Sequence, residues 1–338
     1  MKKVLVILAY IVCIGSLVSC VDTEERKDTP TGNFESLWKI LDERYCFFDY
    51  KQKEYGLDWN AVYDKYRARI NDNMNTVQLF EVLCDMLAEL RDGHVNLSSA
   101  MDYGRYWKWQ EDYPKNYDEF LIDDYLGTDY KIASGLRYRV LDDNIGYIRC
   151  ESFETAIGEG NLDEALSYLL FCRGLIIDIR ENGGGDLTNA ERLAGRFVQE
   201  RTLVGYMQHK TGTGHNDFSE LKEIYLDPSS NVRWHKKVCV LTNRSVYSAA
   251  NAFAVWMHCL PNVTLVGDHT GGGSGLPMSN CLPNGWSVRF SACPMYDANK
   301  EQTEFGIDPD VKVDLNLELI LDYHRDDIIE AARELLVK

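Results

Sequence analysis

The sequence predicts an α/β fold in which a helical segment precedes a core built on parallel strands. Hydrophobic residues recur at helical spacing between residues 33 and 90. From residue 135 onward, strand, turn and helix signals alternate, which is typical of parallel strands joined by helical crossovers. The chain of 338 residues is 45% hydrophobic, enough to bury a sizeable core.

The first 32 residues are predicted to lie outside this fold. Lys2 and Lys3 precede an apolar stretch over residues 4–18, which is typical of a secretory signal and short for a membrane span. The stretch ends in LVSC and resembles a bacterial lipobox, which implies a signal peptide over residues 1–19 and acylation of Cys20. An ordinary cleaved signal with a chance cysteine is the alternative. Residues 20–32 are charged, and we expect them to form a flexible tether.

This anchor has a consequence for localisation. Two or more acyl chains on Cys20 would hold the protein stably on a lipid bilayer. We therefore expect it in a bacterial cell envelope, on the periplasmic face or at the cell surface. The formal net charge is −17 and no long basic run occurs, so a phosphate backbone would be repelled and no nucleic-acid partner is expected.

Residues 33–98 are predicted to form a small helical cap. Leu79, Val82, Leu83 and Met86 illustrate the helical spacing of its apolar residues. Residues 99–134 follow as an aromatic-rich connecting segment, which could cover a cleft, form part of its wall or pack as an aromatic layer.

Residues 135–338 are predicted to form the α/β core. Residues 174–179 (GLIIDI) are typical of a strand buried on both faces. The remaining expected elements are strands over residues 144–150, 237–241 and 263–266, and helices over residues 162–171, 187–198 and 248–259. No Cys-x-x-Cys pair occurs, so neither a zinc site nor a thioredoxin-type site is predicted.

Two predicted strands end in residues suited to chemistry. In DIRENGGGD (178–186), three successive glycines could turn their N–H groups toward an anion, although a tight turn without a ligand would look similar. In LTNRSVYSAAN (241–251), Ser248 falls where a helix begins. It could be an ordinary N-cap, or a nucleophile with the N–H of Ala249 as an oxyanion donor.

These motifs, together with GDHTGGG (267–273) and GIDPD (306–310), resemble the C-terminal processing (tail-specific) and tricorn-core serine peptidases, in the same order and over residues 33–315. The resemblance implies a crotonase-like (ClpP/crotonase-type) core with an N-terminal helical cap. It also implies Ser248 as nucleophile, and the N–H groups of Gly184 or Gly185 and of Ala249 as the oxyanion hole. Neither a metal nor an organic cofactor is implied.

The same resemblance indicates the general base. Processing proteases use a Lys downstream of the Ser, but the nearest Lys after Ser248 is Lys300, which is too distant. The tricorn-like branch uses a His from the N-terminal region, and LRDGHV (90–95) resembles that motif, so His94 is the expected base. His269 competes, although its Gly-rich surroundings favour a structural or groove-lining role.

The sequence departs from the family pattern near the expected base. Gly93 stands where tricorn-like enzymes have a Ser before the His. For the acidic member of the tetrad, Glu304 is the best match, and Glu301 is second.

The segment between cap and core also departs from the pattern. Only 50 residues separate His94 from Asn144, too few for the PDZ domain that many relatives carry. We therefore expect the aromatic segment to contribute to a substrate groove, with these candidates: Trp107, Trp109, His269 and Gly272.

The resulting hypothesis is a lipid-anchored serine peptidase that hydrolyses peptide bonds in peptides or unfolded protein segments. The alternative is a catalytically weak or inactive family member that binds peptides or apolar ligands, because Gly93 breaks the tetrad. A carbohydrate-active lipoprotein is a third possibility, but no matched carboxylate pair supports it.

Overall fold

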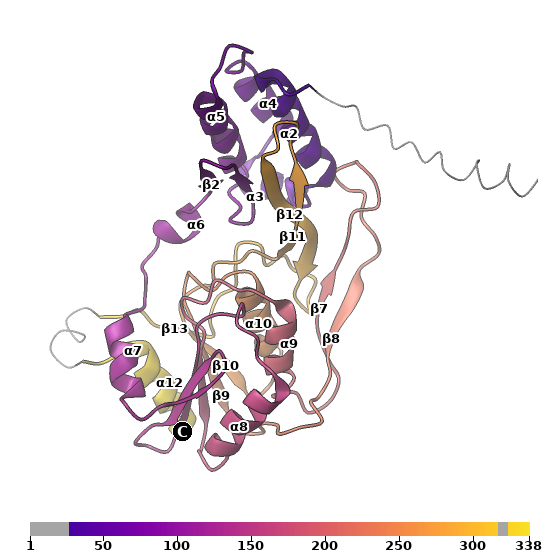
Figure 1. Cartoon of the computed structure of the whole chain (residues 1–338). Helices are drawn as coiled ribbons and strands as arrows, with labels where there is room; N and C mark the ends of the chain where they lie inside the picture. Colours follow the sequence, from indigo (N-terminus) through magenta and orange to yellow (C-terminus); the bar gives the residue numbers. More distant parts are fainter. Residues whose placement is uncertain (1–26, 317–323) are drawn as a thin grey trace, which may run out of the picture.

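The computed structural model describes residues 27–316 and 324–338 (Figure 1). The predicted signal peptide, the predicted lipidation site Cys20 and most of the predicted tether lie outside the described residues. In the part that is described, no helix is long and apolar enough to cross a membrane.

The N-terminal cap is helical, as the spacing predicted, but it has four helices where the apolar runs indicated three: α2 (Pro30–Arg44), α3 (Phe48–Tyr55), α4 (Trp59–Arg67) and α5 (Thr76–Ala88). Asp58 and Asn75 accept hydrogen bonds from the first backbone N–H groups of α4 and α5, so both starts are capped. The helices do not bury their apolar faces on one another alone. Val288 and Phe290, from a strand near the other end of the sequence, complete the cap's core.

A seven-stranded sheet forms the centre of the α/β core. Its order is β13 (Val311–Lys312), β10 (Val263–Gly267), β9 (Val238–Thr242), β6 (Leu175–Asp178), β5 (Gly146–Cys150), β4 (Leu136–Val140) and β3 (Lys131–Ala133). The first five strands run parallel to one another. Strand β4 pairs antiparallel with β5, and β3 pairs antiparallel with β4. The four strands predicted for the core are all present, as β5, β6, β9 and β10.

Helices cover both faces of this sheet (Figure 1). One face packs against α8 (Glu159–Leu169), α9 (Leu187–Ala194) and α10 (Ala249–His258). The other packs against α7 (Glu119–Leu126) and α12 (Asp327–Val337). The alternation is visible in β6, where Ile177 faces the first layer and Ile176 the second. The predicted helix over 187–198 is shorter than expected and ends at Ala194, with Gly195 as its C-cap.

A second, antiparallel sheet was not predicted. It contains β2 (Tyr103–Arg105), β1 (Asn96–Ser98), β12 (Ser287–Tyr296), β7 (Thr202–Met207) and β8 (Lys222–Leu226), and β11 (Gly275–Cys281) also pairs with β12. Strand β12 carries Val288 in the cap's core and Met295 in the core beside α10, so it joins the two parts of the molecule. Between β2 and the core sheet, the connecting segment forms α6 (Lys108–Glu111) and α7.

A buried charge network ties α12 to the carboxyl end of β6. The Arg180 guanidinium donates to Asp178 and, at 2.9 Å, to Asp326, and all three side chains are fully buried. Asp326 also caps the N-terminus of α12. These contacts fix the strand end from which the Gly-rich turn at 183–185 departs.

Candidate active site

Ser248 is held in an uncommon backbone conformation at the start of α10. Its φ is +57°, in a region that non-glycine residues seldom adopt, and its side chain makes no helix-capping hydrogen bond. Its N–H donates to the carbonyl of Gly272 at 2.8 Å, and the preceding N–H of Tyr247 donates to the carbonyl of Asn182 at 3.1 Å. The ordinary N-cap interpretation is therefore wrong, and both loops position the hydroxyl.

The structure brings Ser248 and His94 together, although 154 residues separate them. The distance from His94 Nε2 to Ser248 Oγ is 2.9 Å, and His94 is buried. His94 lies between α5 and β1, in a turn closed by Asp92, whose carboxylate accepts the His94 backbone N–H at 2.7 Å. The base therefore comes from the cap and the hydroxyl from the core.

The surroundings keep the His94 imidazole neutral. Burial lowers its pKa to about 4, opposed by the charge of Asp92 and reinforced by Arg289, Arg105 and Lys51. A neutral imidazole whose Nε2 accepts the Ser248 hydroxyl proton must carry its own proton on Nδ1. That Nδ1 atom is buried and has no hydrogen-bond partner in the described chain.

Glu304 is buried near the site, and its hydrogen bonds go to residues other than His94. Its Oε1 accepts from Lys51 Nζ at 3.3 Å, and its Oε2 accepts from the Ser274 N–H at 3.1 Å. Burial raises the pKa of Glu304 to about 8, to which the charge of Asp92 adds and which Lys51 opposes. The assignment of Glu304 as the acidic member of the tetrad stays a prediction, and both of its oxygens accept from groups other than His94. The second candidate, Glu301, is exposed.

Asp92 is the acidic residue that the sequence reasoning missed. It is buried, accepts from Tyr45 at 2.9 Å and from Ser291 at 2.8 Å, and also takes the His94 N–H. Burial alone would raise the pKa of Asp92, but Lys51 and the hydrogen-bond donors outweigh it and keep the pKa below its usual value. A carboxylate two residues before an expected base was a signal that could have drawn attention to it.

The predicted oxyanion donors are not equivalent. The Gly184 N–H donates to Asn182 Oδ1 at 2.9 Å, so it is already committed. Within the described chain, the N–H groups of Gly185 and Ala249 donate to no other residue, and both residues line the cavity at Ser248. Gly184 contributes space instead, because a Cβ there would lie 2.8 Å from the Cβ of Ser248. The geometry therefore favours Gly185 and Ala249.

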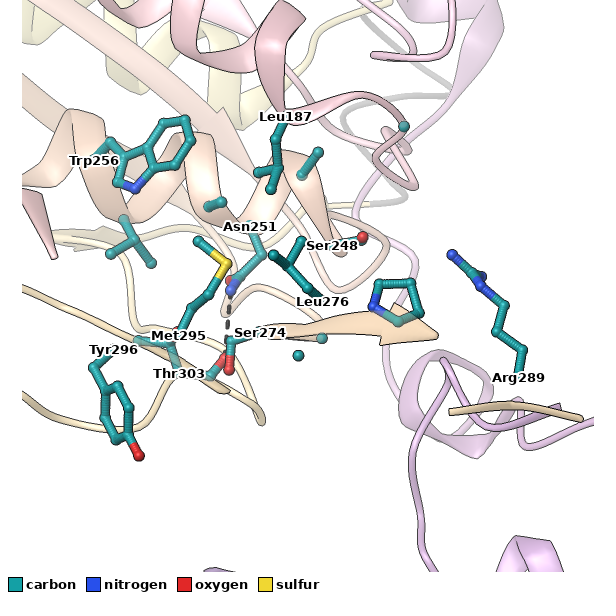
Figure 2. Close-up of a pocket in the computed structure, with 17 residues that line it drawn as sticks. Leu187, Ser248, Asn251, Trp256, Ser274, Leu276, Arg289, Met295, Tyr296 and Thr303 are labelled. Atoms are coloured by element: carbon teal, nitrogen blue, oxygen red, sulfur yellow. Dashed lines mark hydrogen bonds between the residues drawn. The ribbon is translucent and has the colours of Figure 1, made fainter. Parts of the chain in front are cut away.

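A cavity opens beside the Ser248 hydroxyl (Figure 2). It encloses about 580 Å³, part of it open to solvent. One side is apolar and is formed by Leu187, Val255, Trp256, Leu276 and Met295. Figure 2 draws Arg289 on the other side of Ser248 from Trp256 and Met295.

The four residues proposed for a substrate groove do not line this cavity. Trp109 stacks on Tyr247 with ring centroids 4.2 Å apart, and Trp107 is partly exposed beneath the Arg105 guanidinium. The ring of His269 is held between Asp308 at 2.7 Å and the Phe305 carbonyl at 2.8 Å. Gly272 accepts the Ser248 N–H, so it supports the serine from behind.

These features define a class. A serine hydroxyl on a neutral, buried imidazole, beside two uncommitted N–H groups and a cavity, forms a serine hydrolase site on an α/β core. Comparison with known families is more specific. Peptidase family S41 matches residues 144–313, and the tricorn protease C1 domain matches residues 26–88. The first match covers half of the chain, so the chain belongs to peptidase family S41, a family of serine peptidases.

Two curated relatives agree with this assignment. The carboxy-terminal processing protease CtpA of Bacillus subtilis (strain 168) is 29% identical over 178 residues, which is 52% of this chain and 36% of that protein. The tail-specific protease of Haemophilus influenzae (strain ATCC 51907 / DSM 11121 / KW20 / Rd) is 27% identical over 164 residues, 48% of this chain and 22% of that protein. The matches thus span at most about a third of each relative.

Solved structures extend the similarity over most of the chain. A "putative peptidase" from Parabacteroides merdae ATCC 43184 is 53% identical, with a TM-score of 0.88 over 92% of this chain and 98% of that one. Mature CPAF complexed with lactacystin is 11% identical, with a TM-score of 0.67 over 91% of this chain and 97% of that one. The tricorn protease is 19% identical, with a TM-score of 0.54 over 92% of this chain and 37% of that one. The last two similarities concern the fold alone.

Proposed function

We propose that this protein is a serine peptidase that cleaves peptide bonds in peptides or unfolded protein segments. Ser248 is the nucleophile and His94 is its base. The observation that carries the proposal is the 2.9 Å contact between His94 Nε2 and Ser248 Oγ in a buried setting that keeps the imidazole neutral. The layered core also supports the crotonase-like assignment made for the fold.

The geometry supports a two-step reaction. His94 Nε2 takes the hydroxyl proton as Ser248 Oγ attacks the scissile carbonyl carbon, and the N–H groups of Gly185 and Ala249 stabilise the oxyanion. The imidazolium then gives its proton to the leaving amine, which departs and leaves an acyl-enzyme on Ser248. Water, deprotonated by His94, releases the acid product by the same route. Each oxyanion donor is worth about 10² to 10³ in kcat.

The cavity supports a preference for an apolar side chain on the acyl side of the scissile bond. Leu187, Trp256 and Met295 would bury such a side chain next to Ser248. We expect peptides with Leu, Met or Phe at this position to be cleaved with kcat/KM about 10-fold or more above peptides with Asp or Lys there. Equal kcat/KM values across this series of peptides would show that the cavity does not determine specificity.

The lipid anchor is a further part of the proposal. It rests on the LVSC sequence that closes the apolar N-terminal stretch. In cells supplied with a radiolabelled fatty acid, the full-length chain should carry label and fractionate with membranes. The Cys20→Ala variant should carry none. Label that persists in this variant would defeat the assignment of Cys20.

A fluorophosphonate probe tests the catalytic proposal on the full-length chain in detergent. The wild type should be labelled at Ser248, and labelling should be lost in Ser248→Ala and fall strongly in His94→Ala. Matched controls are Ser245→Ala on the same loop and His258→Ala at an exposed histidine. Undiminished labelling of Ser248→Ala, with contaminating hydrolases excluded, would refute the nucleophile.

One observation favours a second function. Because His94 Nδ1 has no acceptor among the described residues, a family member that binds peptides without cutting them is the competing candidate. A folded wild type that neither labels nor cleaves, but binds peptides with apolar side chains, would establish it.

A further inference from the structure

The space that a serine at position 93 would need is already filled. A Cβ built on Gly93 would lie 2.8 Å from the hydroxyl oxygen of Tyr247 and 2.6 Å from Trp109 Nε1. Contacts this short are not made by real Cβ atoms, so a side chain at position 93 would have to displace the Trp109 or Tyr247 ring. A phenol hydroxyl and an indole N–H therefore occupy the region next to the His94 backbone.

Tyr247 is placed to act on His94. Its buried ring packs against the His94 imidazole, with the ring centroids 5.0 Å apart. The Trp109 ring also stacks on the Tyr247 ring, with centroids 4.2 Å apart. Burial, with the charge of Asp92 adding to it, raises the pKa of Tyr247 well above its usual value, so the phenol stays protonated. Tyr247 is also the residue directly before Ser248, so a single short segment presents both the nucleophile and this hydroxyl.

Asp92 can accept a hydrogen bond from the Tyr247 hydroxyl. The Tyr247 hydroxyl lies 3.5 Å from Asp92 Oδ1, a long contact that a small movement would turn into a hydrogen bond. Once the phenol donates to Asp92, its oxygen lone pairs are free to accept. The two rings that pack against Tyr247 each carry a buried nitrogen, His94 Nδ1 and Trp109 Nε1, that has no hydrogen-bond partner among the described residues.

We propose that Tyr247 is the positioning residue that replaces the missing serine: its hydroxyl donates to Asp92 and accepts the hydrogen bond of His94 Nδ1–H during the reaction. Catalytic hydrogen bonds are often long in ligand-free enzymes and tighten in the complex. The proton stays on Nδ1 throughout, and Asp92 supplies a buried negative charge for the imidazolium through the phenol. This inference rests on the proposed function of Ser248 and His94.

The test is Tyr247→Phe in the full-length chain, assayed with a fluorogenic peptide carrying Leu before the scissile bond. Losing a hydrogen bond to a group that becomes charged in the reaction should lower kcat by about 10- to 100-fold and leave KM within about 2-fold. The control is Tyr63→Phe, which removes a phenol hydroxyl bonded to Glu35 in the cap. Unchanged kcat in a folded Tyr247→Phe variant would overturn the inference.

Two readouts separate positioning from a structural effect. In ¹⁵N-labelled protein, a transition-state analogue should shift the His94 Nδ1 proton downfield in the wild type and much less in Tyr247→Phe. If Tyr247→Phe does not fold, 3,5-difluorotyrosine at 247 preserves the shape and weakens the phenol oxygen as an acceptor, so kcat should still fall. Normal kcat with difluorotyrosine would overturn the inference. If the wild type neither labels nor cleaves, the proposed function and this inference fail together. If the wild type is active and Tyr247→Phe has the same kcat, only the inference fails.

Discussion

Acidification should leave the proposed peptidase activity intact at a pH where an ordinary histidine base is already protonated. Only the neutral form of His94 can accept the Ser248 proton, so activity falls as the pH drops through its pKa. With the pKa lowered to about 4, roughly 97% of His94 is neutral at pH 5.5. With an unperturbed value of about 6.5, the neutral share would be about 9%. The expected difference at pH 5.5 is therefore about tenfold.

The assay is kcat/KM for a neutral fluorogenic peptide between pH 3.5 and 8, because this parameter reports ionisations of the free enzyme. The curve should rise through about pH 4 and stay flat to neutrality. Aliquots held at each pH and returned to pH 7 must regain full activity, which separates titration from unfolding. An inflection at pH 6 or above would refute the buried, neutral environment inferred for His94. In Arg289→Ala, loss of a positive charge should move the inflection to higher pH.

Three further predictions concern neighbouring residues. Gly184→Ala would push a Cβ to 2.8 Å from that of Ser248 and should lower kcat about 10²-fold with the circular dichroism spectrum unchanged. Glu304 has a folded pKa of about 8, above its unfolded value of 4.5, so its protonated form adds stability below pH 4.5 that is lost as pH rises to 8. Because His94, with its lowered pKa, contributes the opposite slope below pH 6.5, the Glu304 contribution is measured by urea unfolding as the difference between the wild type and Glu304→Gln. This difference should shrink by at most about 1.4 kcal/mol per pH unit as pH rises, and the same difference taken with Glu301→Gln should stay constant. Asp326→Ala removes one of two carboxylates from buried Arg180 and should lower the free energy of unfolding by about 3 kcal/mol, against little change in Asp327→Ala.

Local patterns in the sequence were enough to predict four strands of the central sheet, β5, β6, β9 and β10, but not β3, β4 or β13. Strands such as β6 and β9 are continuous apolar runs that end in distinctive turns, and their burial on both faces follows from covering helices. The antiparallel sheet has no such local signal, because β1 pairs with β12 across about 190 residues of chain. Pairing of that kind depends on which surfaces meet after the cap and the core have formed.

The candidate site divides in the same way. The order of the motifs identified Ser248 and His94 as candidates, and in the structure Ser248 Oγ lies 2.9 Å from His94 Nε2. Motif order also led to Glu304, but spacing cannot show that Lys51 and a backbone N–H would take both of its oxygens. The sequence shows that position 93 is a glycine. Only the structure shows that the Tyr247 hydroxyl lies where a side chain at position 93 would be.

The division of the site between cap and core sets a condition on catalysis. His94 and Asp92 belong to the cap side, whereas Ser248 belongs to the core, so the reacting pair exists only when the two parts are docked. Two buried contacts maintain the docking: Lys51 from α3 reaches Glu304, and Asp92 accepts from Ser291 on β12. Both contacts are buried in the docked molecule. Separation of cap and core would break them and would remove His94 from Ser248 at the same time, so activity and cap docking should be lost in a single transition.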